Sequence, residues 1–184
     1  MKVVAMVGSF RKGSYNQKLY HYIKTRYHDQ FELEQLPIQK LPIYHQDDET
    51  NPPQIVSQVK EKIKASDGVM IITPEYNHSI PAVLKNALDW ASRVDKVMVN
   101  KPVMIAGTSP GVLGTVRAQE HLRQILKSPG VSAFTLPGNE VFIGGIHEKM
   151  DDQGNLLHQP TIEFLDEVIN QFVNWIVKTK ELKW

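Results

Sequence analysis

The sequence predicts an α/β protein built on a parallel sheet, and three observations indicate this class. Short β-branched or apolar runs alternate with longer segments whose apolar residues recur every three to four positions. This alternation continues along the chain without an internal repeat or a low-complexity segment. The length of 184 residues suits one globular unit, since domains typically have about 100–200 residues. We therefore expect residues 1–184 to form a single domain.

The periodicity assigns an order of strands and helices. We expect strands at residues 2–7, 31–36, 68–73, 102–107 and 131–136. We expect helices at residues 14–27, 55–63, 79–91, 115–127 and 160–178. Ser14 and Gln17 have the spacing of a capping box at the start of the first helix. The third strand is apolar throughout, which is typical of a central strand covered by helices on both faces. Residues 138–159 carry turn signals, and we expect no chemistry there.

Composition narrows the classes of function. Lys and Arg number 21 against 20 Asp and Glu, so the chain lacks the basic excess that binding to nucleic acid requires. The absence of cysteine excludes disulfides, iron–sulfur ligation and a thiol nucleophile, so redox chemistry would need a bound cofactor. No apolar run approaches the ~18–20 residues of a membrane span. The start of the chain does not resemble a secretory signal, and we expect a cytoplasmic protein.

The loop after the first strand is typical of a phosphate site. It ends at a helix N-terminus, where free N–H groups and the helix dipole favour an anion. Serine hydroxyls, the Asn16 amide and the Arg11 guanidinium add donors. A P-loop would need lysine where Ser14 stands, and the loop lacks the G-x-G-x-x-G of a dinucleotide fold. The remaining interpretations are a mononucleotide phosphate site and a simple turn with a surface arginine.

The loop after the third strand suits a planar ring. Pro74 restricts the backbone, Tyr76 offers a flat surface, and Asn77 tolerates unusual torsion angles and can present its amide to a ring edge. Glu75 and His78 have the E-x-x-H spacing of a di-iron ligand pair, but the second copy that such a site needs is missing. We therefore expect no metal, with His78 at the rim and Tyr76 alternatively a surface-packing aromatic.

The loop after the fourth strand, residues 108–114, carries two glycines that permit close approach of the backbone to a ligand. By itself this loop indicates only a connection from a strand to a helix. The sequence contains no H-E-x-x-H, and its other histidines lack the spacing of metal ligands.

Three ordered motifs together resemble the NADPH-dependent FMN reductase family, which includes chromate, quinone and azo-dye reductases. The motifs are Gly8-Ser9-x-Arg11-x-x-Ser14-x-Asn16, then Pro74-Glu75-Tyr76-Asn77-x-Ser79-x-Pro81-x-x-Leu84-Lys85-Asn86-Ala87-x-Asp89-Trp90, then Ser109-x-Gly111-x-x-Gly114. The resemblance extends from residue 2 to about residue 145, and its middle motif is specific. His78 departs from the family, which often has an aromatic residue there, and Phe10 stands where leucine is frequent.

The resemblance implies a flavodoxin-like three-layer sandwich, with a five-stranded parallel sheet in the order 2-1-3-4-5 and helices on both faces. It implies one FMN per chain and a homodimer or homotetramer. Trp90, Arg93, Arg117 and Glu120 would lie at the subunit contact, with core packing as the alternative for Trp90. The residues that would bind FMN are Ser9, Arg11, Ser14, Tyr15, Asn16, Pro74, Glu75, Tyr76, Asn77, Ser109 and Gly111.

The preferred hypothesis is an oxidoreductase that works in two stages. NADPH or NADH delivers a hydride to the flavin, the nicotinamide leaves, and a quinone, azo compound, chromate or free flavin takes its place. The cofactor carries the chemistry, so no catalytic side chain is expected. The alternative is an electron carrier of the flavodoxin kind, which the balanced charge disfavours because such carriers tend to be acidic. A flavin-dependent regulatory protein is a third, weaker interpretation.

Overall fold

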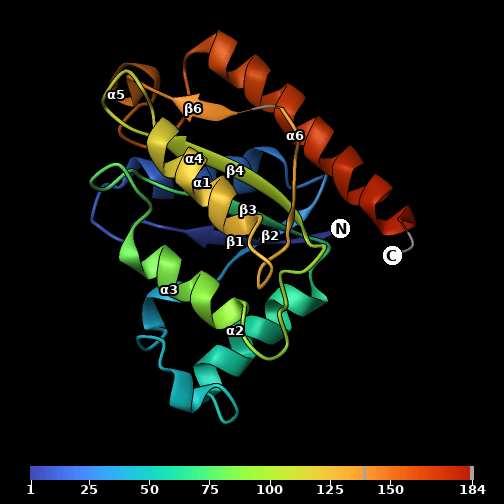
Figure 1. Ribbon diagram of the computed structural model, residues 1–184. Helices are drawn as coiled ribbons and strands as arrows, with labels where there is room; N and C mark the ends of the chain where they lie inside the picture. Colours follow the sequence, from blue (N-terminus) through green and yellow to red (C-terminus); the bar gives the residue numbers. More distant parts are fainter. Residues whose placement is uncertain (139, 183–184) are drawn as a thin grey trace.

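The computed structural model describes residues 1–138 and 140–182. Helices pack on both faces of a twisted central sheet (Figure 1). The strands are β1 (Lys2–Val7), β2 (Glu32–Gln35), β3 (Gly68–Ile72), β4 (Pro102–Thr108), β5 (Phe134–Thr135) and β6 (Val141–Ile143). The α-helices are α1 (Tyr15–Arg26), α2 (Gln54–Ala65), α3 (Ala82–Ala91), α4 (Val116–Leu126), α5 (Ile146–Lys149) and α6 (Gln159–Glu181).

All the paired strands are parallel, in the order β2-β1-β3-β4-β5, with β6 also paired to β4. This confirms the predicted 2-1-3-4-5 order, which is that of flavodoxin-like folds. The central position of β3 is also confirmed, since every residue of that strand is buried between β1 and β4.

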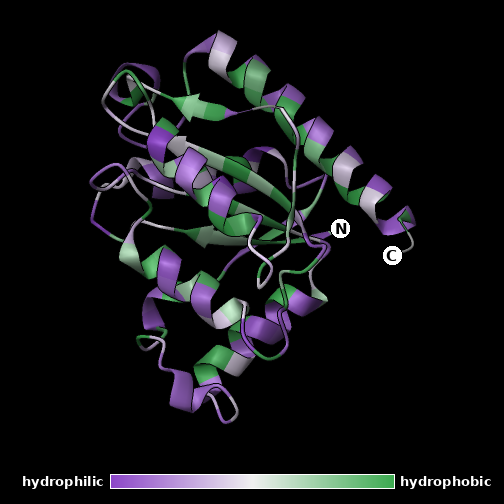
Figure 2. Ribbon diagram, in the orientation of Figure 1, coloured by the Kyte–Doolittle hydropathy of each residue, from purple (hydrophilic) through white to green (hydrophobic). Residues whose placement is uncertain are grey.

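Two hydrophobic cores share the sheet, one on each face. Val3, Ala5 and Val7 of β1 pack with α1 and α6, whereas Val4 and Met6 pack with α2, α3 and α4. Each buried strand therefore contributes side chains to both cores, because successive side chains point to opposite faces of the sheet. Figure 2 shows the apolar sheet and the helices with one polar and one apolar side. Within the described part of the chain, no helix is long and apolar enough to cross a membrane.

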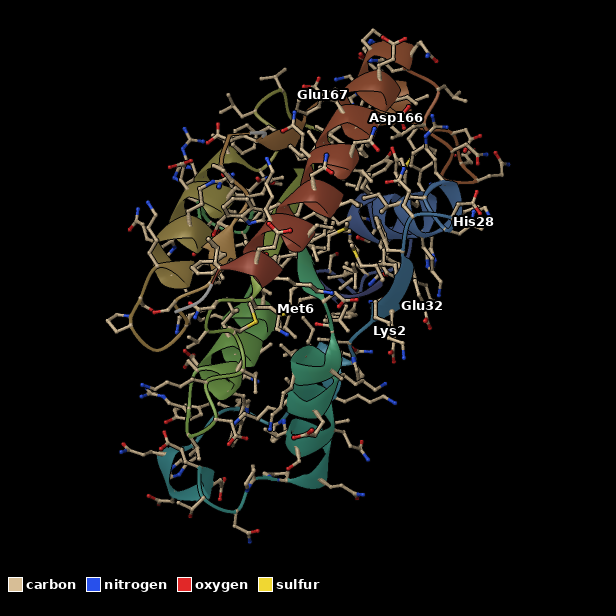
Figure 3. The ribbon with its side chains drawn as sticks, turned by 90° about the vertical axis from the view of Figure 1, so that its right-hand side faces the viewer. Lys2, Met6, His28, Glu32, Asp166 and Glu167 are labelled. Atoms are coloured by element: carbon tan, nitrogen blue, oxygen red, sulfur yellow. The ribbon has the colours of Figure 1, made fainter. Side chains whose placement is uncertain are left out.

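Helix α6 lies across one face of the sheet, with α1 on the same face (Figure 3). The two helices are joined at their exposed edges by Asp166. Its carboxylate accepts hydrogen bonds from Arg26 Nε and Nη2 at 2.8 and 2.7 Å and from the Tyr27 hydroxyl at 2.8 Å. Because these donors favour the ionised carboxyl group, they hold the pKa of Asp166 below its ordinary value.

The fifth strand differs from its prediction. Instead of one strand over residues 131–136, β5 covers only two residues, and the chain returns to β4 as β6. Pairing beyond Leu136 ends at Pro137, which has no N–H to donate. The three residues of β6 then pair with Ala106–Thr108 at the carboxyl end of β4. The sheet consequently has six strands rather than the predicted five.

Two other expectations change in detail. Helix α3 begins at Ala82 rather than at residue 79 because a tight turn precedes Pro81, its N-cap residue. The Ser14 hydroxyl accepts a bond from Gln17 N, as a capping box predicts, but the Gln17 side chain donates to Ser9 O at 2.9 Å instead of returning to the cap. That bond ties the loop after β1 to the first turn of α1.

Trp90 belongs to the core and not to an exposed subunit contact. Its side chain is buried, its Nε1 donates to Pro42 O at 2.9 Å, and its ring meets the Tyr44 ring edge-on at 5.2 Å. Of the two interpretations from sequence, the structure therefore favours core packing.

Candidate functional site

The carboxyl ends of β1, β3 and β4 are neighbours, so the three loops singled out in the sequence meet at one edge of the sheet. Open parallel sheets bind ligands at this edge. Two adjoining hollows lie there. The first, of about 160 Å³, is lined by Ser9, Arg11, Ser14, Tyr15, Asn16, Pro74, Glu75, Tyr76, Thr108, Ser109 and Pro110. The second, of about 560 Å³, is lined by Glu75, Asn77, His78, Ser109, Gly111, Val112, Leu113 and Gly114.

The structure brings all eleven predicted residues to these two hollows, which share Glu75 and Ser109. The sequence analysis did not assign Thr108, Pro110, Val112 and Leu113 to the site. Their place in the loop after the fourth strand was the available signal, but a strand-to-helix loop does not tell which of its residues face inward.

The first hollow opens onto the N-terminus of α1. Ser14 is the N-cap, and within the described structure no carbonyl accepts a hydrogen bond from the N–H groups of Tyr15 and Asn16. The Arg11 side chain is exposed, with its Nη1 3.3 Å from Lys12 O, and the first turn carries no acidic residue. Unpaired N–H groups, a positive helix end and a guanidinium suit a phosphate group.

Asn16 has a role that the sequence did not reveal. Its Nδ2 donates to Thr108 O at 3.0 Å, and its Oδ1 accepts from Thr108 N at 3.1 Å. Both residues are buried. The side chain therefore joins the first turn of α1 to the end of β4, which leaves the main-chain N–H of Asn16 as its donor toward an anion.

The loop after β3 ends in a two-residue hairpin turn. Tyr76 N donates to Ser79 O at 2.9 Å, and Ser79 N donates to Tyr76 O at 3.0 Å. The central residues Asn77 and His78 have φ values of 50° and 62°, in the left-handed region that asparagine and histidine enter more readily than most residues. Tyr76 is 49% exposed. This turn places Tyr76 in the lining of the first hollow and Asn77 in the lining of the second.

The opposite wall depends on a segment to which the sequence analysis assigned no chemistry. Ser109 N donates to Ile143 O at 3.1 Å, and Gly145 N donates to Gly111 O at 3.2 Å. A Cβ atom added to Gly144 would lie 2.2 Å from Val112 O, so only glycine permits this approach. Strand β6 and the residues after it therefore support the loop that carries Ser109 and Gly111.

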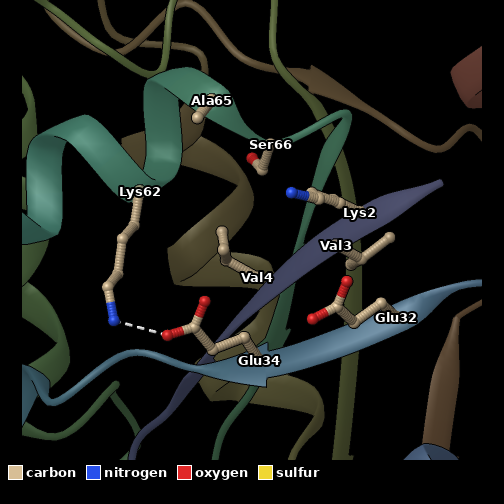
Figure 4. Close-up of a pocket in the computed structure, with 8 residues that line it drawn as sticks. All are labelled: Lys2, Val3, Val4, Glu32, Glu34, Lys62, Ala65 and Ser66. Atoms are coloured by element: carbon tan, nitrogen blue, oxygen red, sulfur yellow. Dashed lines mark hydrogen bonds and ion pairs between the residues drawn. The ribbon is translucent and has the colours of Figure 1, made fainter.

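A further hollow, of about 130 Å³, lies at the amino-terminal edge of the sheet between β1, β2 and α2 (Figure 4). Its charged side chains include Glu34 and Lys62, which pair with each other. It is remote from the loops at the carboxyl ends and is not the candidate site. In residues 1–138 and 140–182, no group of three or more acidic or histidine side chains is arranged to hold a metal ion.

Comparison with known proteins decides the family. A profile of the NADPH-dependent FMN reductase family matches residues 1–148. The chain belongs to this family. It is 43% identical to NADH-dependent flavin reductase subunit 2 of Lactobacillus johnsonii, over 98% of this chain and 100% of that one. It is 39% identical to a quinone reductase of Escherichia coli, over 98% and 97% of the two chains.

Among solved structures, a flavoenzyme NAD(P)H:(acceptor) oxidoreductase from Paracoccus denitrificans matches with a TM-score of 0.89 and 36% identity, over 97% of this chain and 98% of that chain. The protein is accordingly an oxidoreductase that uses FMN and a reduced nicotinamide nucleotide. The site fits FMN in its donor set, since the phosphate-type hollow adjoins a wider hollow bordered by the exposed side chains of Val112 and Leu113.

Proposed function

We propose that this protein oxidises NADPH or NADH and reduces a small acceptor, a quinone in the first instance, through FMN held across the two hollows. The observation that carries the proposal is their adjacency: a small hollow rich in anion donors opens into a wider one with an apolar wall. The quinone and flavin reductase names of the relatives support the acceptor class. Azo compounds and chromate remain in the same group of candidates.

In this proposal the first hollow binds the FMN phosphate. The N–H groups of Tyr15 and Asn16, the hydroxyls of Ser9 and Ser14 and the guanidinium of Arg11 would donate to it. Ser9 and Ser14 are buried and held by the α1 cap and the Gln17 bond, so these donors are ordered before the ligand arrives. Such ordering lowers the entropic cost of binding.

The second hollow would hold the isoalloxazine ring. Pro74, Glu75, Tyr76 and Asn77 would line one side of the ring, and Ser109 and Gly111 the other. Bound FMN supplies the hydride chemistry. The chain positions the ring, and its N–H groups would stabilise the negative charge of the reduced form. Because the hollow is open to solvent, nicotinamide and acceptor can occupy it in turn, and product protons can come from water.

We also propose that residues 1–184 act as one domain, since both cores use the same sheet. The proposed assembly is a homodimer or homotetramer, with the exposed side chains of Arg93, shortly after α3, and of Arg117 and Glu120 on α4 at the contact. Because the reaction consumes NAD(P)H, the proposed location is the cytoplasm.

The electron-carrier alternative is less well supported. The family and its named relatives are NAD(P)H-dependent reductases, and the net charge of +1 lacks the acidic excess that guides a carrier to its partner. Direct reduction by a nicotinamide separates the two, because a carrier would receive electrons only from a partner protein.

The test uses purified protein loaded with FMN. We expect a yellow protein whose flavin absorbance bleaches when NADPH or NADH is added without oxygen and returns when a quinone follows. Stopped-flow traces with each nucleotide would show which donor is preferred. A protein that stays colourless after incubation with FMN would refute the proposed function. Bound FMN that neither nucleotide reduces would favour the carrier.

A further inference from the structure

Helix α4 lacks a cap from its own sequence. Its N-cap residue Thr115 makes no capping bond, because the buried Thr115 hydroxyl accepts from Gln119 Nε2 at 3.0 Å inside the helix. The first turn of α4 also contains no acidic residue. The unpaired N–H groups of a helix start need acceptors from elsewhere.

Glu75 supplies that acceptor from the ring-side loop. Its Oε2 accepts hydrogen bonds from the main-chain N–H groups of Arg117 at 3.0 Å and Ala118 at 3.2 Å. Its Oε1 lies 3.8 Å from Arg117 Nη1, and the side chain is only 17% exposed. The carboxylate is thus directed at the positive end of α4 and at a guanidinium, a favourable place for a negative charge.

A second bond joins the same loop to the same helix. Ser79 Oγ lies 2.8 Å from His121 Nδ1, one turn further along α4. Between Glu75 and Ser79 the backbone passes through the left-handed turn at Asn77 and His78. Such torsion angles are unfavourable for residues other than glycine and persist only where the surroundings impose them. The two bonds to α4 attach the residues on both sides of this turn to the helix.

Helix α4, which Glu75 caps, directly follows the loop that lines the opposite wall of the second hollow. Ser109, Gly111 and Leu113 lie in the loop that runs directly into α4, whereas Asn77 and His78 lie in the loop that Glu75 and Ser79 attach to α4. The Glu75 carboxylate therefore connects the loop after β3, on one wall, to the loop after β4, on the other wall, through the start of α4.

We propose that Glu75 is a positioning residue that sets the width of the flavin-ring slot by capping α4, with its charge satisfied by the helix and not presented to the ring. This inference rests on the proposed function, because it gives the second hollow the ring of FMN. Glu75 is among the residues that line both hollows. Its carboxylate acts on the ligand only through the loop and the helix that it joins.

The experiment compares Glu75→Ala with Glu75→Gln. The glutamine amide oxygen can still accept from both N–H groups, whereas alanine removes the cap. Glu61→Ala is the control, since it removes an exposed carboxylate from α2, a helix that lines neither hollow. FMN and riboflavin are titrated by fluorescence well below the unfolding temperature of each variant, and hydrogen exchange is followed at the amides of Arg117 and Ala118 and in residues 73–79.

We expect Glu75→Ala to weaken binding of both flavins at least tenfold and to speed exchange in the loop and at the start of α4. The flavin affinity of Glu75→Gln should stay within about threefold of that of the wild type, and Glu61→Ala should bind flavin as the wild type does. If Glu75→Ala loses as much affinity for riboflavin as for FMN, the effect concerns the flavin ring, because riboflavin lacks the phosphate. A merely structural role would speed exchange without changing flavin affinity.

Two results would overturn the inference alone. One is a wild type that binds flavin while Glu75→Ala binds it equally well. The other is a loss with Glu75→Gln as large as with Glu75→Ala, which would assign the effect to the charge and not to the cap. A wild type that binds neither flavin would instead refute the proposed function, and the inference would fall with it.

Discussion

Replacing Asn16 tests whether this residue joins the phosphate-site helix to the sheet. In Asn16→Ala, Thr108 loses both partners of its main chain, the acceptor of its N–H at 3.1 Å and the donor to its carbonyl at 3.0 Å. Both residues are nearly inaccessible, with 4% of Asn16 and 2% of Thr108 exposed. A buried polar group without a partner costs about 1–3 kcal/mol.

Two such groups amount to roughly 2–6 kcal/mol, and water entering through the first hollow, which Thr108 lines, recovers part of the cost. We therefore expect the free energy of unfolding to fall by about 2–4 kcal/mol. For a chain of this length, each kcal/mol shifts the melting temperature by about 2–4 °C, so the expected loss is roughly 4–16 °C.

The assay is urea unfolding of the flavin-free protein, followed by circular dichroism. Gln17→Ala is the matched control, because it removes a single bond, from Gln17 Nε2 to Ser9 O, and is expected to cost about 1 kcal/mol. The FMN dissociation constant of Asn16→Ala should rise less than tenfold, since the proposed donor to the phosphate is the main-chain N–H. A stability within 0.5 kcal/mol of the wild type, on the scale of a surface substitution, would refute this account of the side chain.

Three further substitutions have definite expected outcomes. Arg11→Ala should weaken FMN binding at least tenfold, about 1.4 kcal/mol, in equilibrium titrations where Lys12→Ala has little effect; an unchanged dissociation constant would remove Arg11 from the phosphate site. Trp90→Phe removes the indole donor to the carbonyl of residue 42, which keeps its second donor, Asn86 Nδ2, at 2.9 Å, and should lower the free energy of unfolding by about 1 kcal/mol; no loss in urea unfolding would contradict the importance of this bond. The pKa of Asp166 is lower in the folded protein than in the unfolded chain, where it is about 3.9. The ionised carboxylate therefore stabilises the fold above that pH, and this contribution is lost as the pH falls through the folded pKa. Asp166→Asn should therefore lower the free energy of unfolding at neutral pH and reduce its dependence on pH below about pH 4. Acid unfolding curves of the same shape for the variant and the wild type would count against this expectation.

Local chemistry predicted the elements that depend on nearby residues. The apolar run of β3 specified a buried central strand, and Ser14 specified the start of α1, where its hydroxyl accepts from Gln17 N. Position after a strand was enough to bring Ser9, Arg11 and Asn77 to one edge, because parallel strands end together.

The sequence did not predict the pairing of β6 with β4. The turn signals of residues 138–159 did not indicate that β6 would return to β4, because a three-residue strand has too little periodicity to detect. The same limit applies to Gly144, whose importance comes from its approach to Val112 O.

The sequence by itself determined the class of fold and the position of three loops at one edge of the sheet, since alternating periodicity is a local pattern, and its resemblance to a family indicated the kind of chemistry. Only the tertiary structure decided what individual polar side chains do. Asn16 and Glu75 both belong to motifs that indicate ligand binding, yet their side chains hold Thr108 and α4. The physical reason is that a hydrogen-bond donor or acceptor takes whichever partner folding brings within about 3 Å, and partners 92 and 42 residues away leave no trace in the spacing of a motif.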